Sequence, residues 1–404
     1  MKRGRLFLQD EENAFLAPFA SRSGALPGRV QRPRRFDEPE DKWRTRFQLD
    51  RDRVLYSGSF RRLQYKTQVF VTHEGDLYRT RMTHSLEVTQ IARSIASALG
   101  LNETLAEAIA LVHDIGHPPF GHGGEKELGR LMDGSGGFDH NLQGLRVVDE
   151  LERCYPEFPG LNLCWETREG LARHQTLFDR PALPDEFAVY SQPSPECQVV
   201  NVADVIAWCT HDLDDALRIG LLKPGWLESK TGDIPMLDEV KNTMDSMHTV
   251  VQGLEPAGRG IGRKRAMSNM LGRLIEDVTD ATSGRIEDAG IETTEEFRGQ
   301  ESPPVSFSEE VTSQVKDIAE SMLYHLYLNP VVNRMVYKGK KIIAELFATF
   351  REDPTLIPEG FRKEEAEEPA ERVACDYIAG MTDRYAMDLH DMLFQPHART
   401  TDWF

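Results

Sequence analysis

The sequence predicts an all-α protein, and three observations support this fold class. Apolar residues recur at spacings of three and four along most of the chain, which is the period of a helix that buries one face. Glycine, asparagine and proline stand where these periodic stretches end. No stretch of any length alternates apolar and polar residues as a half-buried strand does, and no internal repeat is visible.

The chain begins with a polar, proline-containing segment, residues 1–46, in which arginines are mixed with acidic residues. We expect this segment to be a mobile arm; the alternative is an arm that packs on a neighbouring subunit or contacts nucleic acid. Helical spacing begins soon after it. The spacing is broken at residues 70–76, where we expect a loop or a short β element.

The following helices are predicted from apolar spacing and end signals. An apolar face that includes His84 and Ile95 predicts a helix over residues 83–99, and Gly100 ends it. Asn102 can cap the next helix. The remaining expected helices are 103–113, 125–132, 141–152, 199–219, 311–350 with an interruption at Asn329–Pro330, and 374–394. We expect an exposed loop at the acidic residues 282–306 and a loop or lid at residues 352–371.

Composition and charge narrow the class of protein. Of the 404 residues, 40% are hydrophobic and 28% are charged, which is typical of a globular protein in water. The net charge of −18 argues against broad non-specific nucleic-acid binding and requires a locally basic pocket for any highly anionic substrate. The five cysteines form no Cys-x-x-Cys motif, and no apolar run is long enough for a signal peptide or membrane span. We expect a cytoplasmic protein without membrane contact.

The stretch from Leu111 to Glu125 carries the chemistry, because it holds three histidines, an aspartate and a glutamate. The adjacent His113 and Asp114 can ligate one divalent cation. His84 lies on an apolar helix face and Asp204 lies among apolar residues, where unpaired ionisable groups are costly. A hydrogen-bonded core histidine and an aspartate paired with an arginine would explain them equally. Together the four would form a shell of two histidines and two aspartates with open positions for water and substrate.

The order of these residues and the text around them resemble a known family. The ordered set His84, His113–Asp114 and Asp204 resembles the HD-domain phosphohydrolases, and the extended text resembles their deoxynucleoside triphosphate triphosphohydrolase branch, the dGTPase-like proteins. The phrases that carry this resemblance are Phe60–Phe70, Arg79–Ser85, His113–Glu125, Gly137–Asn141, Thr210–Asp215 and Asp376–Tyr385. The resemblance implies an all-α, HD-domain helical core with additional C-terminal helices.

The resemblance also implies a division of the chain and a reaction. It implies an N-terminal arm (1–46), an HD-type catalytic core (47–225) and a helical C-terminal region (226–404) that packs on the core and completes the substrate pocket. Enzymes of this branch hydrolyse a dNTP to the deoxynucleoside and inorganic tripolyphosphate. The implied cofactor is one divalent metal ion per subunit, Mn²⁺ or Mg²⁺ first, with Fe, Ni, Co or Zn also compatible.

Residue roles follow from the same resemblance. The implied metal ligands are His84, His113, Asp114 and Asp204, and the implied catalytic residues are His122, Glu125 and His117. The implied substrate-binding residues are Arg81, Gln68, His140, Trp208, Asp212, His174 and Lys66. For His174 a structural hydrogen bond, and for Lys66 a solvated helix face, remain equal alternatives. Position 208 is a tyrosine in the family and a tryptophan here, which puts discrimination against the 2′-hydroxyl in question.

Three alternatives remain open from the sequence. The first is another HD-type phosphohydrolase, a nucleotidase or phosphodiesterase acting on nucleoside monophosphates or nucleic-acid ends. The second is a regulatory nucleotide-binding scaffold with little turnover. The third concerns His117 and His122, which in some HD enzymes would hold a second metal instead of serving catalysis. We also expect a homo-oligomer, and an activating nucleotide or single-stranded DNA remains an open expectation.

Overall fold

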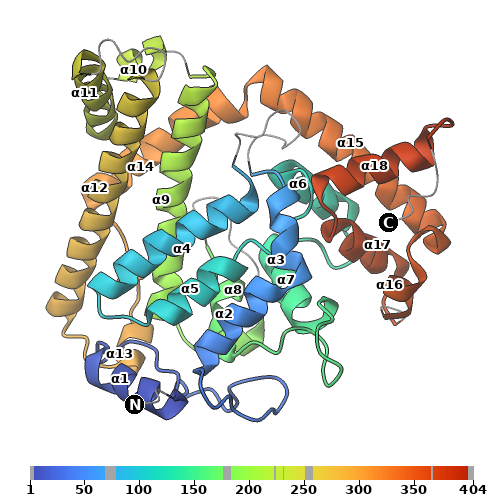
Figure 1. Ribbon diagram of the computed structural model, residues 1–404, viewed down its shortest axis with the longest axis horizontal. Coiled ribbons are helices and arrows are strands. Elements are labelled where there is room, and N and C mark those ends of the chain that lie inside the picture. The colour runs from blue at the N-terminus through green and yellow to red at the C-terminus, as the bar shows by residue number, and fades with distance from the viewer. Residues whose placement is uncertain are drawn as a thin grey trace.

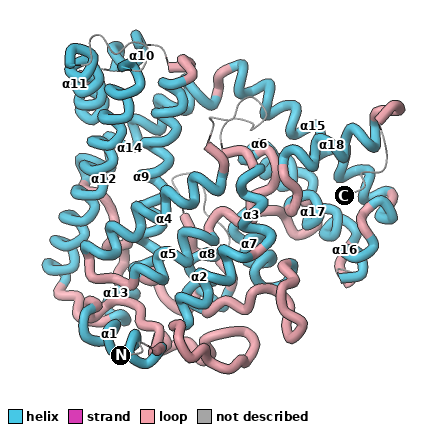
Figure 2. Tube along the Cα trace, in the orientation of Figure 1, coloured by secondary structure: helices cyan, strands magenta, loops and turns pink. Residues whose placement is uncertain are grey.

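The computed structural model confirms the all-α fold class. It describes residues 4–68, 79–175, 183–222, 224–230, 232–250, 258–364 and 367–398, so the expected break at residues 70–76 lies outside the described residues. Within these ranges the chain forms helices joined by loops, with isolated β-bridges such as Arg34 to Cys164 and no strand (Figure 2). None of the helices in the described ranges combines the length and the apolar character needed to cross a membrane.

The helices follow one another along the chain as shown in Figure 1. The N-terminal half contains α1 (Arg5–Phe15), α2 (Arg46–Tyr56), α3 (Gly58–Arg62), α4 (Arg81–Ala98), α5 (Glu103–Val112), α6 (Gly121–Leu131), α7 (His140–Arg146), α8 (Trp165–Ala172) and α9 (Pro195–Arg218). The C-terminal half contains α10 (Pro224–Lys230), α11 (Pro235–Val250), α12 (Gly258–Ala289), α13 (Thr294–Arg298), α14 (Glu309–Met322), α15 (Pro330–Glu352), α16 (Glu359–Glu364), α17 (Ala370–Ala379) and α18 (Asp383–Phe394).

Most of the helices predicted from apolar spacing are confirmed to within a few residues. The predicted helix 83–99 corresponds to α4, 103–113 to α5, 125–132 to α6 and 199–219 to α9. The predicted helix 141–152 begins as α7 and continues as a π-helical turn over Val147–Leu151. The interruption at Asn329–Pro330 is also confirmed, because the Asn329 side chain caps α15 by accepting a hydrogen bond from the backbone N–H of Val331.

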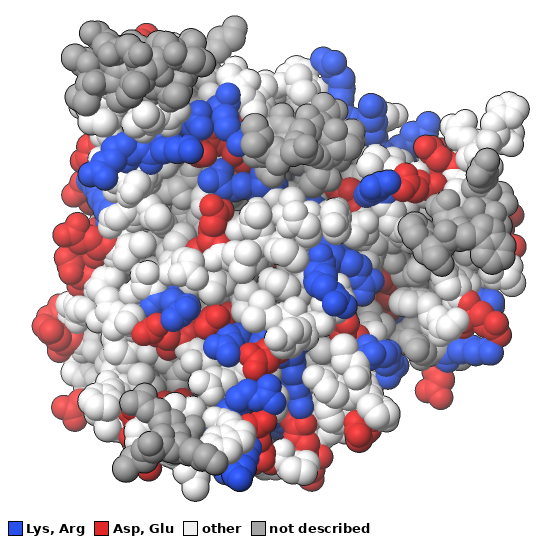
Figure 3. Space-filling model, viewed as in Figure 1, with Lys and Arg blue, Asp and Glu red and all other residues white. Residues whose placement is uncertain are grey.

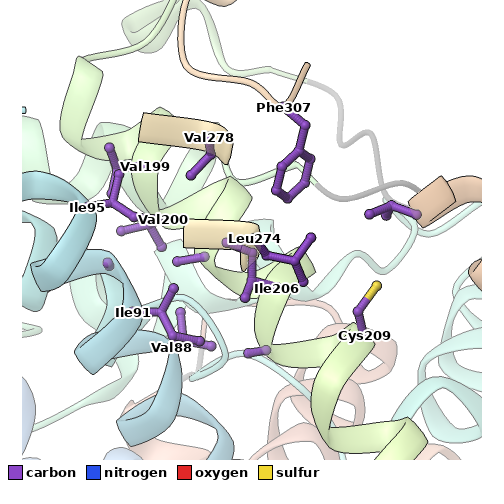
Figure 4. Packing of buried hydrophobic residues seen from close by; sticks show 14 of the residues in the cluster. Val88, Ile91, Ile95, Val199, Val200, Ile206, Cys209, Leu274, Val278 and Phe307 are labelled. Atoms are coloured by element: carbon purple, nitrogen blue, oxygen red, sulfur yellow. The ribbon is translucent and has the colours of Figure 1, made fainter. Parts of the chain in front are cut away.

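The centre of the molecule is an apolar cluster between α4, α9 and α12 (Figures 1 and 4). Val88, Ile91 and Ile95 from α4 face side chains of α9 such as Val200 and Ile206, and Leu274 and Val278 of α12 close the cluster, all of them buried. Burial of a side chain of this size contributes about 1.5–3 kcal/mol. This packing fixes α4 against α9, the two helices from which much of the candidate site projects.

The N-terminal segment is not a mobile arm in its described residues, 4–46, which contradicts our expectation. Its Phe19 ring stacks on Phe297 with centroids 5.8 Å apart, and the backbone N–H of Trp165 donates to the carbonyl of Pro33. Arg34 forms an ion pair with the buried Asp50. Arg34 and Arg46 of the expected mobile arm are therefore paired with buried carboxylates of the core, whereas Arg29 and Arg32 are exposed. The three-part division of the chain stays a prediction.

Residues 282–306 are not an exposed loop, which corrects a second expectation. The first part extends α12 to Ala289, and the short helix α13 follows. Phe297 and Arg298 are fully buried, and the Arg298 guanidinium pairs with the buried Glu169, with Nη1 2.6 Å from Oε1. Most of the acidic residues that suggested a loop are exposed on these helices, while Glu292 and Glu301 lie in the short exposed stretches before and after α13.

The C-terminal region forms a second, smaller apolar cluster around α15 and α17, on the right of Figure 1. The helix expected over 374–394 is two helices, because the chain turns at Gly380 and the Thr382 side chain caps α18. The loop or lid expected at 352–371 contains a 3₁₀ turn at Pro354–Leu356 and the short helix α16. Asp383, at the start of α18, accepts a hydrogen bond from the backbone N–H of Phe120 and so connects this region to the candidate site.

Candidate functional site

Three helices of the core position the predicted metal ligands. A capping box at Thr80 starts α4, so that His84 stands in its first turns. Helix α5 ends at Val112, and His113 follows as its C-cap residue. Asp204 lies in the middle of the long helix α9. All four predicted ligands are buried, with exposed fractions between 1% for His113 and 9% for Asp204.

The side chains of these residues converge. His84 Nε2 lies 2.8 Å from Asp204 Oδ1, His113 Nε2 lies 4.0 Å from the same oxygen, and His113 Nε2 lies 3.6 Å from Asp114 Oδ1. Ligand atoms of His84, His113 and Asp114 all lie within 4.8 Å of one another. The same holds for His113, His174 and Asp204, so His174 stands beside the four predicted ligands.

Two buried polar atoms at this point lack a hydrogen bond within the described residues, although one of them, Asp114 Oδ2, lies 3.0 Å from Arg81 Nη1. His113 Nδ1 donates to the carbonyl of Ala110 at 2.7 Å, which leaves the lone pair of Nε2 pointing into the group. Neither His113 Nε2 nor Asp114 Oδ2 has a hydrogen-bond partner among the described residues. Buried polar atoms are rarely left in this state unless an ion or water satisfies them. The residues present therefore fit a divalent cation with mixed nitrogen and oxygen ligands.

The electrostatics of the group favour the ligand forms of its side chains. Burial lowers the pKa of His113 to about 4, so its imidazole is neutral. Burial opposes ionisation of Asp114, but the Arg81 guanidinium, whose Nη1 lies 3.0 Å from Oδ2, and the nearby histidines hold its pKa well below the ordinary value. Burial alone would lower the pKa of His84, but the hydrogen bond with Asp204 and the charge of that carboxylate outweigh burial and raise the pKa above its ordinary value. A cation at this point would replace the proton that His84 and Asp204 share.

A second polar group follows directly in sequence, and Glu125 is its centre. His140 Nδ1 donates to Glu125 Oε1 at 2.7 Å, while His122 Nδ1 lies 3.5 Å and His117 Nδ1 3.9 Å from Oε2. Burial works against the Glu125 carboxylate, but its hydrogen bonds with His122 and His140 hold its pKa well below the ordinary value. His117 and His140 stack with ring centroids 3.8 Å apart. His117 also joins the two groups, because its Nε2 lies 3.1 Å from Asp114 Oδ1.

A strained turn presents His122 at the start of α6. Phe120, the N-cap residue, has a φ of 64°, a backbone conformation that residues other than glycine rarely adopt. The hydrogen bond from its N–H to Asp383 holds this turn, and strain of this kind persists where surrounding structure enforces it. The His122 side chain is 55% exposed, unlike the other three members of its group. It is therefore free to reach a ligand.

Trp208 and Asp212, two of the predicted substrate contacts, are joined by a residue that we did not predict. The indole Nε1 of Trp208 donates to the Tyr327 hydroxyl at 2.6 Å, and that hydroxyl donates to Asp212 Oδ2. Burial raises the pKa of Asp212 to about 6. Tyr327 belongs to a π-helical turn, Leu323–Tyr327, a feature that is frequent at functional sites. In the sequence, the one feature that could have drawn attention to Tyr327 is the aromatic-rich stretch before Asn329–Pro330.

The remaining predicted contacts are placed as follows. His174 Nε2 lies 3.4 Å from Asp204 Oδ2, and its Nδ1 pairs with Asn201 Oδ1, a second residue that we did not predict. Gln68 is half-buried and its Oε1 has no hydrogen-bond partner within the described ranges. Lys66 is not on a solvated helix face: it is buried, and Nζ donates to the carbonyls of His117 and Ala379.

Comparison with known proteins shows which sequences this chain is similar to. The sequence profile of the HD domain matches residues 81–209, and that of the phosphohydrolase-associated domain matches residues 305–392. The chain is 42% identical over 393 residues to a deoxyguanosinetriphosphate triphosphohydrolase-like protein of Geobacter sulfurreducens, with 96% of this chain and 97% of the relative covered. Proteins of the same name from Syntrophus aciditrophicus, 45% identical with 98% of both chains covered, and Thiobacillus denitrificans, 44% identical with 94% and 97% covered, are also similar.

Proposed function

This chain belongs to the deoxyguanosinetriphosphate triphosphohydrolase-like family of HD-domain phosphohydrolases, and we propose that it hydrolyses dNTPs to deoxynucleoside and inorganic tripolyphosphate. The observation that carries this proposal is the convergence of His84, His113, Asp114 and Asp204, with His113 Nε2 left unsatisfied beside a second, histidine-rich group. Phosphoryl chemistry of this kind needs a cation site next to a proton donor, and the two groups meet at His117.

The first group would hold one divalent ion per subunit, with Mn²⁺ or Mg²⁺ proposed first and Fe, Ni, Co or Zn also compatible. When bound, such an ion polarises a phosphoryl oxygen and makes water a better nucleophile. The chain's own contribution is to keep both aspartates ionised and His113 neutral in a buried position. Arg81, 3.0 Å from Asp114, adds a fixed positive charge where a phosphate would approach.

The second group supplies the proton. In the proposed reaction, water attacks the α-phosphorus, the bond from phosphorus to O5′ breaks, and the leaving oxygen takes a proton. His122 is the proposed donor, because it is the exposed histidine of the group and Glu125 can orient its ring. His117 and His140 lie between this donor and the cation site, where we propose that they contact phosphate or relay protons.

The proposed substrate contacts follow the geometry of the site. Arg81 faces phosphate, Gln68 offers an unpaired amide oxygen to the sugar 3′-hydroxyl, and Trp208 and Asp212 contact the deoxyribose. Trp208 directs its N–H to Tyr327, so it presents an indole ring where the family has a phenol. His174 is proposed to act beside Asp204. The Lys66 ammonium group donates hydrogen bonds to two backbone carbonyls, so a direct contact with phosphate would require those hydrogen bonds to break.

The proposal is tested by product analysis. The purified protein is incubated with each of the four dNTPs and four rNTPs, and with a dNMP, in Mn²⁺ or Mg²⁺. Release of deoxynucleoside and tripolyphosphate from a dNTP, separated by anion exchange, is the expected result. Orthophosphate from the dNMP, with the triphosphates intact, would overturn it and support a nucleotidase. Hydrolysis of rNTPs at comparable rates would show that Trp208 does not exclude ribose.

The setting of the enzyme is part of the proposal. We propose a cytoplasmic homo-oligomer, with the subunit number to be measured by light scattering. Activation by a nucleotide or by single-stranded DNA is measured by adding each to the assay above. A rise in turnover at fixed substrate concentration identifies an effector.

A further inference from the structure

A basic pocket lies away from the residues of the two polar groups described above. It is formed by the N-terminal segment at residues 29–35, helix α8 and the 3₁₀ turn Asp185–Phe187. Its volume of about 300 Å³ is at the lower end of the range for small-ligand sites. Its lining includes Arg29, Arg32, Arg34, Arg35, Arg168 and Trp165. Five arginines around one cavity are unexpected in a chain whose net charge is −18.

Two of the five arginines are committed to the fold. Arg34 is bound to Asp50 and, through Nε at 3.0 Å, to Glu38. Arg168 is buried and binds Asp149 through Nε and Nη2, at 2.8 and 2.7 Å. It also reaches Glu186, a half-exposed carboxylate that lines the pocket. These ion pairs hold the Arg34 and Arg168 side chains in place. Each carboxylate in them faces a guanidinium group, so the pairs do not make the pocket acidic.

Of the other three arginines, Arg29 and Arg32 carry positive charge that the described residues do not neutralise, and Arg35 shares its carboxylate partner with Arg168. Arg29 and Arg32 are exposed and form no ion pair with a described carboxylate; Arg29 donates instead to the carbonyl of Val189 and lies over the Tyr190 ring. Arg35 pairs with Asp149 at 3.1 Å, but Arg168 uses both oxygens of that carboxylate. In the lower half of the face shown in Figure 3, basic and acidic side chains lie interspersed.

We propose that this pocket binds a phosphate-bearing small anion through Arg29, Arg32 and Arg35. Guanidinium groups donate in pairs to phosphate oxygens. The contacts of Arg29 with the Val189 carbonyl and of Arg35 with Asp149 hold these two side chains in place, which lowers the entropy lost on binding. A volume of about 300 Å³ suits a small anion, so we propose an inorganic polyphosphate or a nucleotide as the source of the phosphate. This site is independent of the proposed hydrolase activity, because it shares no residue with the metal-facing group.

The test is calorimetric titration of the full-length protein, as purified, with inorganic tripolyphosphate at low ionic strength. The Arg29→Ala/Arg32→Ala variant removes the two unpaired charges. The matched control, Arg130→Ala/Arg384→Ala, removes two arginines that are 65% and 83% exposed on α6 and α18 and so makes the same change in net charge. Thermal unfolding of both variants checks that each is folded.

We expect the pocket variant to lose one class of binding site or to weaken it at least tenfold, while the control stays within about threefold of the wild type. Affinity should fall as salt is added, because the contacts are ionic. Equal affinities and site numbers in the two variants would overturn the proposal. Adenosine monophosphate is the second probe: binding that also depends on Arg29 and Arg32 identifies a nucleotide site, and binding of tripolyphosphate alone identifies a polyphosphate site. The result is independent of whether dNTPs are hydrolysed.

Discussion

Two buried aspartates, Asp50 and Asp114, show opposite arrangements. Asp50, on α2, is fully buried and accepts hydrogen bonds from Arg34, from the backbone N–H and thiol of Cys164, and from Thr167. Asp114 is also buried, but its Oδ2 faces a single guanidinium group, with Arg81 Nη1 3.0 Å away, and His113 Nε2 beside it has no hydrogen-bond partner in the described part of the chain. Burial alone therefore does not mark a functional carboxylate. What distinguishes Asp114 is its neighbours: ligand atoms of His84, His113 and Asp114 lie within 4.8 Å of one another, an arrangement that fits a shared cation.

The same substitution at the two aspartates should separate function from stability, and the largest effect is expected at the site. Asp114→Asn removes a charged ligand, so the bound divalent metal should fall from about one per subunit to near zero. The rate of dNTP hydrolysis should fall by about a thousandfold or more. Elemental analysis and the product assay measure the two effects. Metal content and turnover close to the wild type would exclude Asp114 as a ligand.

Asp50→Asn should destabilise the fold and spare the site. It weakens the pairing of Arg34 and places an amide among donors, which costs about 3 kcal/mol in the free energy of unfolding. Denaturant unfolding measures this cost. Below its unfolding transition the variant should bind metal as the wild type does, and loss of metal from a folded Asp50→Asn protein would contradict the distinction between the two aspartates.

His122→Ala tests whether the second polar group contributes chemistry instead of a metal site. General acid catalysis is typically worth about 10²–10⁴ in rate, so turnover should fall by that factor while metal content is unchanged. His390→Ala is the matched control, because His390 pairs with Glu345 on the C-terminal helices. About two metal ions per subunit in the wild type, with one lost in His122→Ala, would assign His122 to a second metal.

Lys66 is a third kind of buried charge, since the acceptors it binds are carbonyls. Burial lowers its pKa from 10.5 to about 7. Between those values the unfolded chain binds a proton that the folded chain does not, so stability rises with pH; below pH 7 both states are protonated. The difference in unfolding free energy between the wild type and Lys66→Met should therefore grow from pH 7 upward, by at most about 1.4 kcal/mol per pH unit. Lys363→Met, at an exposed lysine, is the matched control for the loss of one lysine. A flat difference would contradict the lowered pKa.

The sequence predicted correctly those features that depend on residues close to one another in the chain. The apolar spacing around His84 located α4, Asn102 marked a helix start, and Asn329–Pro330 marked an interruption, all of which the structure confirms. The side chains of His84, His113, Asp114 and Asp204 lie together as the resemblance implied, although their roles stay predictions. Family membership is confirmed by relatives that match nearly the whole chain.

Prediction from the sequence failed where a charged side chain forms an ion pair with a residue far away in the chain. Arg298 reads as part of an acidic loop, but it is buried because Glu169 lies opposite it. The arginines near residue 34 read as a solvated arm, but Asp50 pairs with one of them. Tyr327 joins Trp208 to Asp212 across more than a hundred residues of chain, a contact that no local spacing predicts.

The most direct test of the account is an anomalous diffraction measurement on crystals of this protein grown with Mn²⁺. The account predicts one anomalous peak per subunit, bonded to His113 Nε2 and to side chains of Asp114, His84 and Asp204. His117, Glu125 and His140 also bring ligand atoms within 4.8 Å of one another, so they are the internal competitor. A peak at that second group alone, or no peak at either, would contradict the claim that the unsatisfied atoms around His113 mark the metal centre.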